Sequence, residues 1–290
     1  AVAYVMYPLE FEYHRAGSVT EAISLLSQHN GAKVLAGGHS LIPAMKLRLA
    51  DPGILVDIGR ISELNGIRPG TGTVSIGGLT THSTLASSKY LPAGLSEAAS
   101  MVADVQVRNR GTIGGNVAHA DPASDLPPIL TALGATFHIS SSEGNRKVSA
   151  VDFFTGMFET DLDEGEILTA VEVESEQDGI GSAYSKLFNP ASGYAMVGVA
   201  AVLTIDDGKC TKASVALGGV TPYTTSATSV EAALIGQSMD EVTIASAAAA
   251  VQDDLGDTVM SDIHAGSDYR REMTTVFVQR ALVSAAKRAT

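Results

Sequence analysis

The first 60 residues alternate between helical and strand-like spacing of their apolar positions. Ser18-Val19-Thr20-Glu21 has the form of a capping box, and apolar residues follow it at helical spacing until Asn30-Gly31. Short apolar runs at 33–36 and 54–58 predict strands, and a second helix is expected to begin near Ser40. The pattern predicts a small α/β unit of about 60 residues.

The middle of the chain mixes short helical and strand patterns. Alternating or clustered β-branched residues predict strands at 74–76, 135–140, 147–151 and 167–173. Apolar residues at helical spacing predict short helices at 81–87, 95–102 and 126–133. The glycine-rich stretch 108–125 is expected to be irregular, and irregular segments of that length inside a compact domain usually serve a function.

An acidic run, Glu172–Asp178, closed by Gly179 and Gly181, marks the start of a further domain. Beyond it, strands are predicted at 183–188, 196–205 and 213–217, and helices at 229–235, 243–255 and 269–289. Strands followed by helices indicate an α+β domain with a small antiparallel sheet. We therefore divide the chain into residues 1–60, 61–178 and 179–290.

The charge of the chain argues against two classes of partner. Nineteen Lys and Arg against 32 Asp and Glu give a formal net charge of −13, which disfavours binding to nucleic acid or to an anionic membrane. No apolar stretch approaches the roughly 20 residues needed to cross a bilayer. Residues 1–8 lack the pattern of a signal peptide, so a cytoplasmic location is expected.

Cys210 is the single cysteine of the chain. The chain therefore cannot form an internal disulfide or hold an iron–sulfur cluster with four cysteines of its own. Cys210 follows the turn-like sequence Asp206-Asp207-Gly208-Lys209, and we interpret it as an incidental thiol. Any redox centre must be held in another way.

Two glycine-rich segments carry the candidate chemistry, Ala36–Ser40 and Arg110–Pro122. Each contains a Gly-Gly pair, so backbone N–H groups can point into one concavity without a Cβ atom in the way. The first segment follows a predicted strand and precedes a predicted helix, which adds a helix N-terminus as an anion site. Together the segments indicate pyrophosphate binding, although their spacing is not the G-x-G-x-x-G of the Rossmann fingerprint.

Other chemistry for the same residues is less favoured. A metal site could be imagined from His119-Ala120-Asp121 with His82 or His39, but the spacing is not that of metal ligands, and no metal is predicted. Ser40 or Ser124 could pair with a histidine as a nucleophile, but the sequence has no G-x-S-x-G elbow. Hydroxyl groups beside glycine turns are more often helix caps.

Both glycine-rich segments closely resemble the two FAD-binding segments of the flavoprotein (medium) subunits of molybdenum hydroxylases, the family of xanthine and carbon monoxide dehydrogenases. The matching residues are Ala36–Arg48 and Thr112–Pro127. Met6–Tyr13 is similar to the start of the family's chains, which makes residues 1–5 an extension. The carbon monoxide dehydrogenase branch is the most similar, and His39, where many other members have Gln, favours that branch.

The resemblance implies an α+β fold with two FAD-binding subdomains of the vanillyl-alcohol-oxidase (PCMH) type, residues 1–60 and 61–178. A C-terminal flavoprotein domain, residues 179–290, would close over the flavin. By resemblance, the FAD diphosphate and ribityl chain contact Ala36, Gly37, Gly38, His39, Ser40, Leu41, Thr112, Ile113, Gly114, Gly115 and Asn116, and Asp125 and Leu126 extend the site.

Two residues of the C-terminal domain are candidate catalytic residues by the same resemblance. Lys186 matches a lysine that lies near the flavin in the family, where a cation would stabilise negative charge on the reduced ring. Tyr194 could stack on the ring or form a hydrogen bond with it. Gly193 stands where relatives often carry Asp.

The resemblance implies an electron-transfer subunit. Electrons would pass from [2Fe-2S] clusters of a small partner through FAD to an external acceptor, and a large partner would carry the molybdopterin cofactor. The expected assembly is a dimer of heterotrimers, associated with a membrane only peripherally, through the acceptor. The substrate is open among carbon monoxide, a heterocycle, an aldehyde and a purine, and the acceptor among NAD, a quinone and a cytochrome.

Two alternative functions also stay open. One is a self-sufficient FAD oxidoreductase of the same fold with its own substrate pocket over the flavin ring. Such a chain should contain an acid/base pair, and none is evident in the sequence. The other is a scaffold that has lost the flavin, which the two intact glycine segments disfavour.

Overall fold

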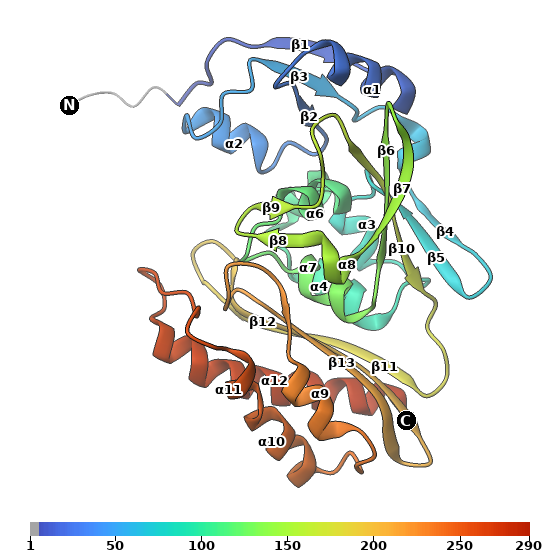
Figure 1. The fold of residues 1–290 in the computed structure, drawn as a ribbon, viewed down its shortest axis with the longest axis vertical. Coiled ribbons are helices and arrows are strands. Elements are labelled where there is room, and N and C mark those ends of the chain that lie inside the picture. The colour runs from blue at the N-terminus through green and yellow to red at the C-terminus, as the bar shows by residue number, and fades with distance from the viewer. Residues whose placement is uncertain (1–5) are drawn as a thin grey trace.

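A computed structural model describes residues 6–290, in which three main β-sheets follow one another along the chain (Figure 1). A fourth, two-stranded sheet pairs Phe154–Gly156 with Glu159–Thr160. Residues 1–5, which include the expected extension and the first five residues of the 1–8 segment considered as a signal peptide, lie outside the described residues. Among residues 6–290, no helix is long and apolar enough to cross a membrane.

The first sheet contains three parallel strands in the order β1-β3-β2, drawn at the top of Figure 1. Its elements are β1 (Glu12–Arg15), α1 (Val19–Gln28), β2 (Lys33–Leu35), α2 (Leu41–Lys46) and β3 (Ile54–Asp57). The N-cap predicted for α1 is confirmed, because the Ser18 hydroxyl accepts a hydrogen bond from the Glu21 amide at 3.1 Å. The α/β unit is confirmed, with β1 as an unpredicted polar edge strand.

The second sheet is antiparallel and has the order β4-β5-β10-β6-β7. Its strands are β4 (Ile67–Pro69), β5 (Thr73–Gly77), β6 (Thr136–Ser141), β7 (Gly144–Ser149) and β10 (Ile167–Glu174). Val171 of the central strand lies opposite Ile76 and Phe137, and all three side chains are buried in one core. All four predicted strands are present, and β4 was missed because it is short and ends in Pro69.

Short elements surround this second sheet. They are the 3₁₀ turn at Ser62–Leu64, α3 (His82–Ala86), α4 (Ala93–Met101), α5 (Val105–Arg110), α6 (Ile113–His119), α7 (Leu126–Ala132), α8 (Ala150–Phe153), β8 (Phe154–Gly156) and β9 (Glu159–Thr160). The predictions for α3, α4 and α7 are confirmed within two residues.

The prediction that 108–125 is irregular is wrong, because α5 ends and α6 lies within this stretch. Asp104 and Thr112 cap the two helices through side-chain hydrogen bonds to backbone amides. A Gly-Gly pair lowers helix propensity, but close packing requires it here. A Cβ atom on Gly114 would lie 2.7 Å from the carbonyl oxygen of Gly78, so only glycine lets the helix approach that strand end.

The third sheet is antiparallel, in the order β11-β12-β13-β14, and forms the lower part of the molecule in Figure 1. Its strands are β11 (Ile180–Phe188), β12 (Ala195–Asp206), β13 (Lys209–Gly218) and β14 (Thr225–Ser226). The helices beside it are α9 (Thr228–Leu234), α10 (Glu241–Ala249), α11 (Val251–Asp254) and α12 (Ser267–Ala289). The single helix predicted at 243–255 is two helices, divided at Ala250.

The second and third parts share a core. Tyr184 of β11, with Ala200 and Ala216 of the same sheet, packs among the buried residues of the second part. The three main sheets lie within 1–60, 61–178 and 179–290, one in each range. We propose these ranges as the domains of the chain.

Candidate functional site

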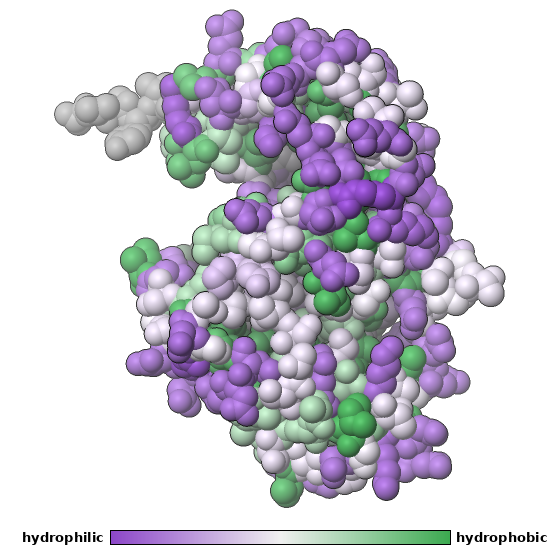
Figure 2. Space-filling view, viewed as in Figure 1, coloured by the Kyte–Doolittle hydropathy of each residue, from purple (hydrophilic) through white to green (hydrophobic). Residues whose placement is uncertain are grey.

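A cleft of about 1150 Å³ is lined by residues from all three parts of the molecule. Figure 2 shows the surface hollowed between the first part, at the top, and the second part below it. The first part contributes β2, α2 and the glycine loop between them, and the second contributes α6 and most of the segment 158–168. The third contributes Ser192, Gly193 and Tyr194.

The first glycine loop presents unused backbone donors. The amide groups of Gly37, Gly38, His39 and Ser40 donate no hydrogen bond to any group of residues 6–290. Gly38 has a φ of +75°, a left-handed conformation that glycine adopts without strain. Successive free amides at such a turn form an anion-binding concavity.

The two glycine loops are in direct contact. A Cβ atom on Gly37 would overlap the backbone carbonyl of Arg110, the residue before Gly111 in the second loop. Because both groups are backbone, neither could move aside as a flexible side chain would. Gly37 therefore sets the distance between the two loops.

The second loop differs from the first in its backbone. The amides of Ile113 and Gly114 donate to the carbonyls of Thr80 and Gly78, at 2.9 and 2.8 Å, and the Gly115 amide donates to the Thr112 hydroxyl at 3.2 Å. The expectation that both loops present free amides to one concavity is therefore wrong for these three amides. Packing against residues 78–80 uses the first two, and the helix cap at Thr112 uses the third.

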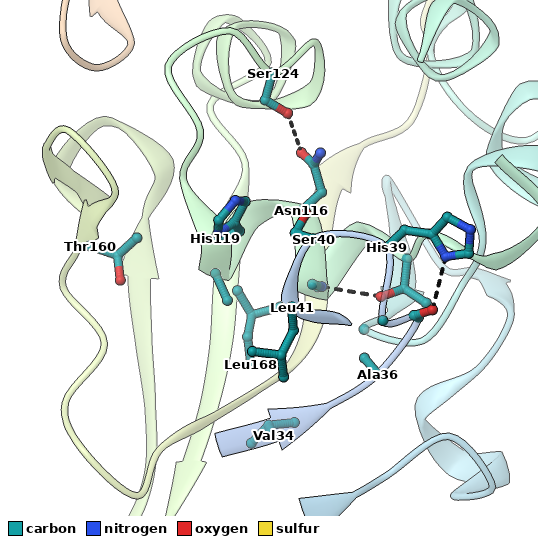
Figure 3. A pocket seen from close by; sticks show the side chains of 18 of the residues that line it. Val34, Ala36, His39, Ser40, Leu41, Asn116, His119, Ser124, Thr160 and Leu168 are labelled. Atoms are coloured by element: carbon teal, nitrogen blue, oxygen red, sulfur yellow. Dashed lines mark hydrogen bonds between the residues drawn. The ribbon is translucent and has the colours of Figure 1, made fainter. Parts of the chain in front are cut away.

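Asn116 supplies a polar group from this loop instead. Its side-chain oxygen accepts a hydrogen bond from the Ser124 hydroxyl at 2.8 Å, as Figure 3 shows. Its side-chain N–H groups donate to none of residues 6–290, which leaves them for a molecule in the cleft. The His39 Nδ1 lies 3.1 Å from the Gly37 carbonyl oxygen; Figure 3 marks this contact with a dashed line from the labelled His39.

A buried charge cluster lies behind the cleft wall. The Lys186 ammonium is 2.8 Å from the Asp125 carboxylate and donates to the carbonyl of Met101 at 2.9 Å. The Tyr184 hydroxyl donates to the same carboxylate at 2.8 Å. Burial raises the pKa of Asp125 to about 6, although Lys186 and Tyr184 both oppose this rise.

Tyr194 is carried by the loop between β11 and β12. Its side chain is partly exposed and lines the cleft. Burial, and then the nearby Asp121 carboxylate, raise the pKa of Tyr194, so the phenol stays protonated at neutral pH. Gly193 has a φ of +74°, and a Cβ atom there would lie 3.1 Å from the Cα of Ala103, so the backbone of this loop favours glycine at this position.

Most of the residues expected at the site line the cleft. These are Ala36, Gly37, Gly38, His39, Ser40, Leu41, Thr112, Gly114, Gly115, Asn116, Asp125 and Tyr194. Ile113, Leu126 and Lys186 do not line it: the first two are fully buried in the core, and Lys186 lies behind Asp125.

Sequence reasoning missed one wall of the cleft. This wall comprises Phe158–Thr160 and Leu162–Leu168, and Figure 3 shows Thr160 and Leu168 beside the cavity. Glu164 links it to the first part, because its carboxylate accepts a hydrogen bond from the Gly31 amide at 3.0 Å. The acidic run from Asp161 to Glu166 is a loop signal in the sequence, but it does not indicate which surface the loop covers.

Two family models cover most of the chain. Residues 9–174 match the FAD-binding domain in molybdopterin dehydrogenase, and residues 182–285 match the C-terminal domain of the carbon monoxide dehydrogenase flavoprotein.

Full-length relatives agree with these models. The chain is 39% identical over 288 residues to the carbon monoxide dehydrogenase medium chain of Afipia carboxidovorans, covering 98% of this chain and 99% of the relative. It is 38% identical over 284 residues to the glyceraldehyde dehydrogenase medium chain of Sulfolobus acidocaldarius, covering 97% and 100%.

A solved carbon monoxide dehydrogenase from Hydrogenophaga pseudoflava contains a chain that superposes with a TM-score of 0.93, at 41% identity, covering 98% of this chain and 100% of that one. The resemblance inferred from the glycine segments is thereby confirmed, and so is the α+β fold with an FAD-binding region followed by a flavoprotein C-terminal domain. The chain belongs to the family of FAD-binding medium subunits of molybdenum hydroxylases, as an oxidoreductase subunit.

Proposed function

We propose that this chain is the subunit through which electrons leave a molybdenum hydroxylase complex, with FAD held in the cleft. The observation that carries the proposal is the row of unused amides at residues 37–40, placed against the second glycine loop. Bound FAD would supply the ability to exchange electrons one or two at a time.

The cleft fits FAD in size and in chemistry. Its volume of about 1150 Å³ exceeds the roughly 300–1,000 Å³ of pockets for drug-sized ligands, as a dinucleotide requires. The free amides at 37–40 suit a diphosphate, since they bind an anion without a bulky cation. Apolar residues of the opposite wall, among them Leu162 and Leu168, together with Val34 of β2, suit an aromatic base.

Each lining residue then has a proposed role. The amides of Gly37 to Ser40 hold the diphosphate, and the Asn116 amide group donates to the ribityl or phosphate oxygens. Tyr194, brought by the C-terminal domain, covers the flavin ring. Asp125 faces the cleft as a hydrogen-bond acceptor, and Lys186 and Tyr184 hold its carboxylate in place. Lys186 therefore acts through Asp125.

The partners are proposed from the family. Relatives are medium chains of larger enzymes, and the single Cys210 is buried in β13. We propose a small partner with [2Fe-2S] clusters, a large partner with the molybdopterin cofactor, and a dimer of such heterotrimers. A cytoplasmic location stays a prediction.

Carbon monoxide is the proposed substrate of the complex, and an aldehyde is the second candidate. Relatives named for carbon monoxide and for glyceraldehyde are 39% and 38% identical to this chain. His39 in the first glycine loop supports the carbon monoxide branch. No residue of this chain would contact the substrate in either case.

The test is purification of the native complex through a tag on this chain. We expect three subunits, FAD, iron and molybdenum, with bleaching of the flavin absorption by carbon monoxide under anaerobic conditions. If glyceraldehyde bleaches the flavin and carbon monoxide does not, the substrate is an aldehyde. A lone chain that carries FAD and reduces an acceptor with its own organic substrate would instead establish the self-sufficient oxidoreductase, and a complex without flavin would overturn the proposal.

A further inference from the structure

His82 is a buried polar residue of the cleft to which the proposed function gives no role. It is the first residue of α3, it is 3% exposed, and it lines the cleft. Its backbone amide donates to the Gly111 carbonyl at 3.1 Å. Its ring lies against the same residue, because a Cβ atom on Gly111 would be 2.8 Å from ring atoms Cδ2 and Nε2. The imidazole thus sits at the start of the second glycine loop.

The imidazole lacks hydrogen bonds within the described chain. Nδ1 is shielded from solvent and has no partner among residues 6–290, and no hydrogen bond to Nε2 is formed with these residues either. A buried polar group without a partner costs about 1–3 kcal/mol, and native proteins leave few such groups. Because Nδ1 is shielded, the ring nitrogen that a molecule in the cleft could reach is Nε2, and its lone pair or N–H is free to pair with such a molecule.

The charged and titratable neighbours do not supply it. The Arg108 guanidinium of α5 is directed to the carbonyls of Val102 and Ala103, at 2.8 and 2.9 Å. His39 of the first glycine loop uses its Nδ1 at the Gly37 carbonyl. Burial, then Arg108, then His39 lower the pKa of His82 to about 4. The ring is therefore neutral at pH 7, with one N–H donor and one lone pair.

We propose that His82 is a further cofactor-binding residue, whose imidazole hydrogen-bonds the diphosphate–ribityl portion of FAD where the two glycine loops meet. The inference rests on the proposed placement of FAD in the cleft. A neutral N–H donor suits a phosphate oxygen in this position. This donor adds to the free amides of the first loop. The imidazole also supplies a donor on the side of the second loop, whose Ile113 and Gly114 amides already donate to protein carbonyls.

A purely structural role for His82 makes a different prediction. If the ring served only to fill space beneath Gly111, an apolar side chain of similar volume would serve as well. His82→Leu keeps much of the volume and removes the nitrogens, whereas His82→Gln keeps a hydrogen-bonding group. His138 provides the control, because it lies on β6, outside the cleft, where its Nε2 is 3.6 Å from a Glu172 carboxylate oxygen.

The experiment titrates FAD into the flavin-free full chain and follows flavin fluorescence. We expect Kd to rise at least tenfold in His82→Leu, to change less than threefold in His82→Gln, and to stay unchanged in His138→Leu. Circular dichroism checks that each variant is folded. Equal FAD affinity in His82→Leu and the wild-type chain would overturn the inference.

A second readout does not depend on the leucine variant. In chains labelled with ¹⁵N-histidine, the His82 ring signals are identified by their loss in His82→Gln, and they should shift on addition of FAD. Unchanged signals in a chain that binds FAD would overturn only the inference about His82 and would leave the proposed function intact. A wild-type chain that binds no FAD would overturn the proposed function instead, which keeps the two failures distinguishable.

Discussion

At the scale of single residues, Gly37 shows how backbone contact fixes the site. Its Cα lies against the Arg110 carbonyl, so an added methyl group must push the two glycine loops apart. We expect Gly37→Ala to raise the Kd for FAD at least tenfold and to lower the free energy of unfolding by about 1–3 kcal/mol, the usual effect of overpacking. Fluorescence titration and urea denaturation measure the two effects.

Gly266 is the matched control for this substitution. It precedes α12 with a φ of −71°, and a Cβ atom there would meet no atom within 4 Å. Gly266→Ala should cost no more than about 1 kcal/mol, since alanine is a poorer N-cap residue than glycine, and should leave FAD affinity unchanged. Loss of FAD in both variants, or in neither, would show that the contact with Arg110 does not set the geometry of the cleft.

Single residues also show the limit of sequence reasoning. The glycine loop at 36–41 could be predicted because turn chemistry is local, and all of its residues line the cleft. Membership of a motif does not say which way a side chain points. Ile113 and Leu126 begin α6 and α7 with their side chains in the core, and the unpartnered ring of His82 appears only once residues 78–82 and 111–114 are packed together.

At the scale of elements, β11 and α7 are joined by one buried ion pair. Lys186→Met would leave the Asp125 carboxylate buried with Tyr184 as its remaining side-chain partner. Removing one partner of a buried pair costs about 3–5 kcal/mol, and we expect a loss of this size at pH 8 in urea denaturation. The double variant Asp125→Asn/Lys186→Met should recover most of it, because a neutral amide needs no cation.

The pH dependence of the Lys186→Met loss follows from the sign of the shift. The folded pKa of Asp125 is already raised to about 6 by burial, and removing the cation raises it further. Between the unfolded and the folded pKa of Asp125, the folded state holds a proton on this carboxyl that the unfolded state has released. The free energy of unfolding therefore falls as pH rises through this interval. The loss relative to wild type should therefore shrink from pH 8 to pH 5. An equal loss at both pH values would contradict a buried, unpaired carboxylate.

Elements were predictable where periodicity was long and apolar. The strands near 167–173 and 196–205 and the helix near 269–289 were predicted because apolar residues recur in each. The helices α5 and α6 were missed because their stability comes from caps at Asp104 and Thr112 and from glycine packing, which periodicity does not register. Polar or very short edge strands, β1, β4 and β14, were missed for a similar reason.

At the scale of the whole molecule, the cleft exists because three separately patterned parts meet. The order of sheets could be predicted, since each part has its own apolar periodicity. The meeting of the parts could not, since it depends on contacts between residues far apart in sequence. Glu97 of α4 is one such contact: it accepts hydrogen bonds from the Tyr184 amide at 3.0 Å and from the Arg288 guanidinium at 2.9 Å.

Arg288 near the end of α12 completes this link between the second and third parts. Its guanidinium also donates to the Ser182 carbonyl at 2.7 Å, so one side chain joins α4, β11 and α12. Hydrogen bonds to charged groups contribute about 1.5–3 kcal/mol each, reduced here because both side chains are partly exposed. For Arg288→Ala we expect the Tm of the flavin-free chain to fall by about 2–5 °C, measured by differential scanning calorimetry.

Lys287, the exposed neighbour of Arg288 on the same helix, forms no hydrogen bond or ion pair with residues 6–290, so Lys287→Ala removes a charge without removing a link. Its Tm should stay within about 1 °C of the wild-type value, since most exposed positions tolerate substitution. Because FAD would contact both parts across the cleft, saturating FAD should raise the Tm of Arg288→Ala and of wild type alike. Equal Tm values for the two variants would mean that the shared core around Tyr184, rather than the Glu97–Arg288 link, holds the third part in place.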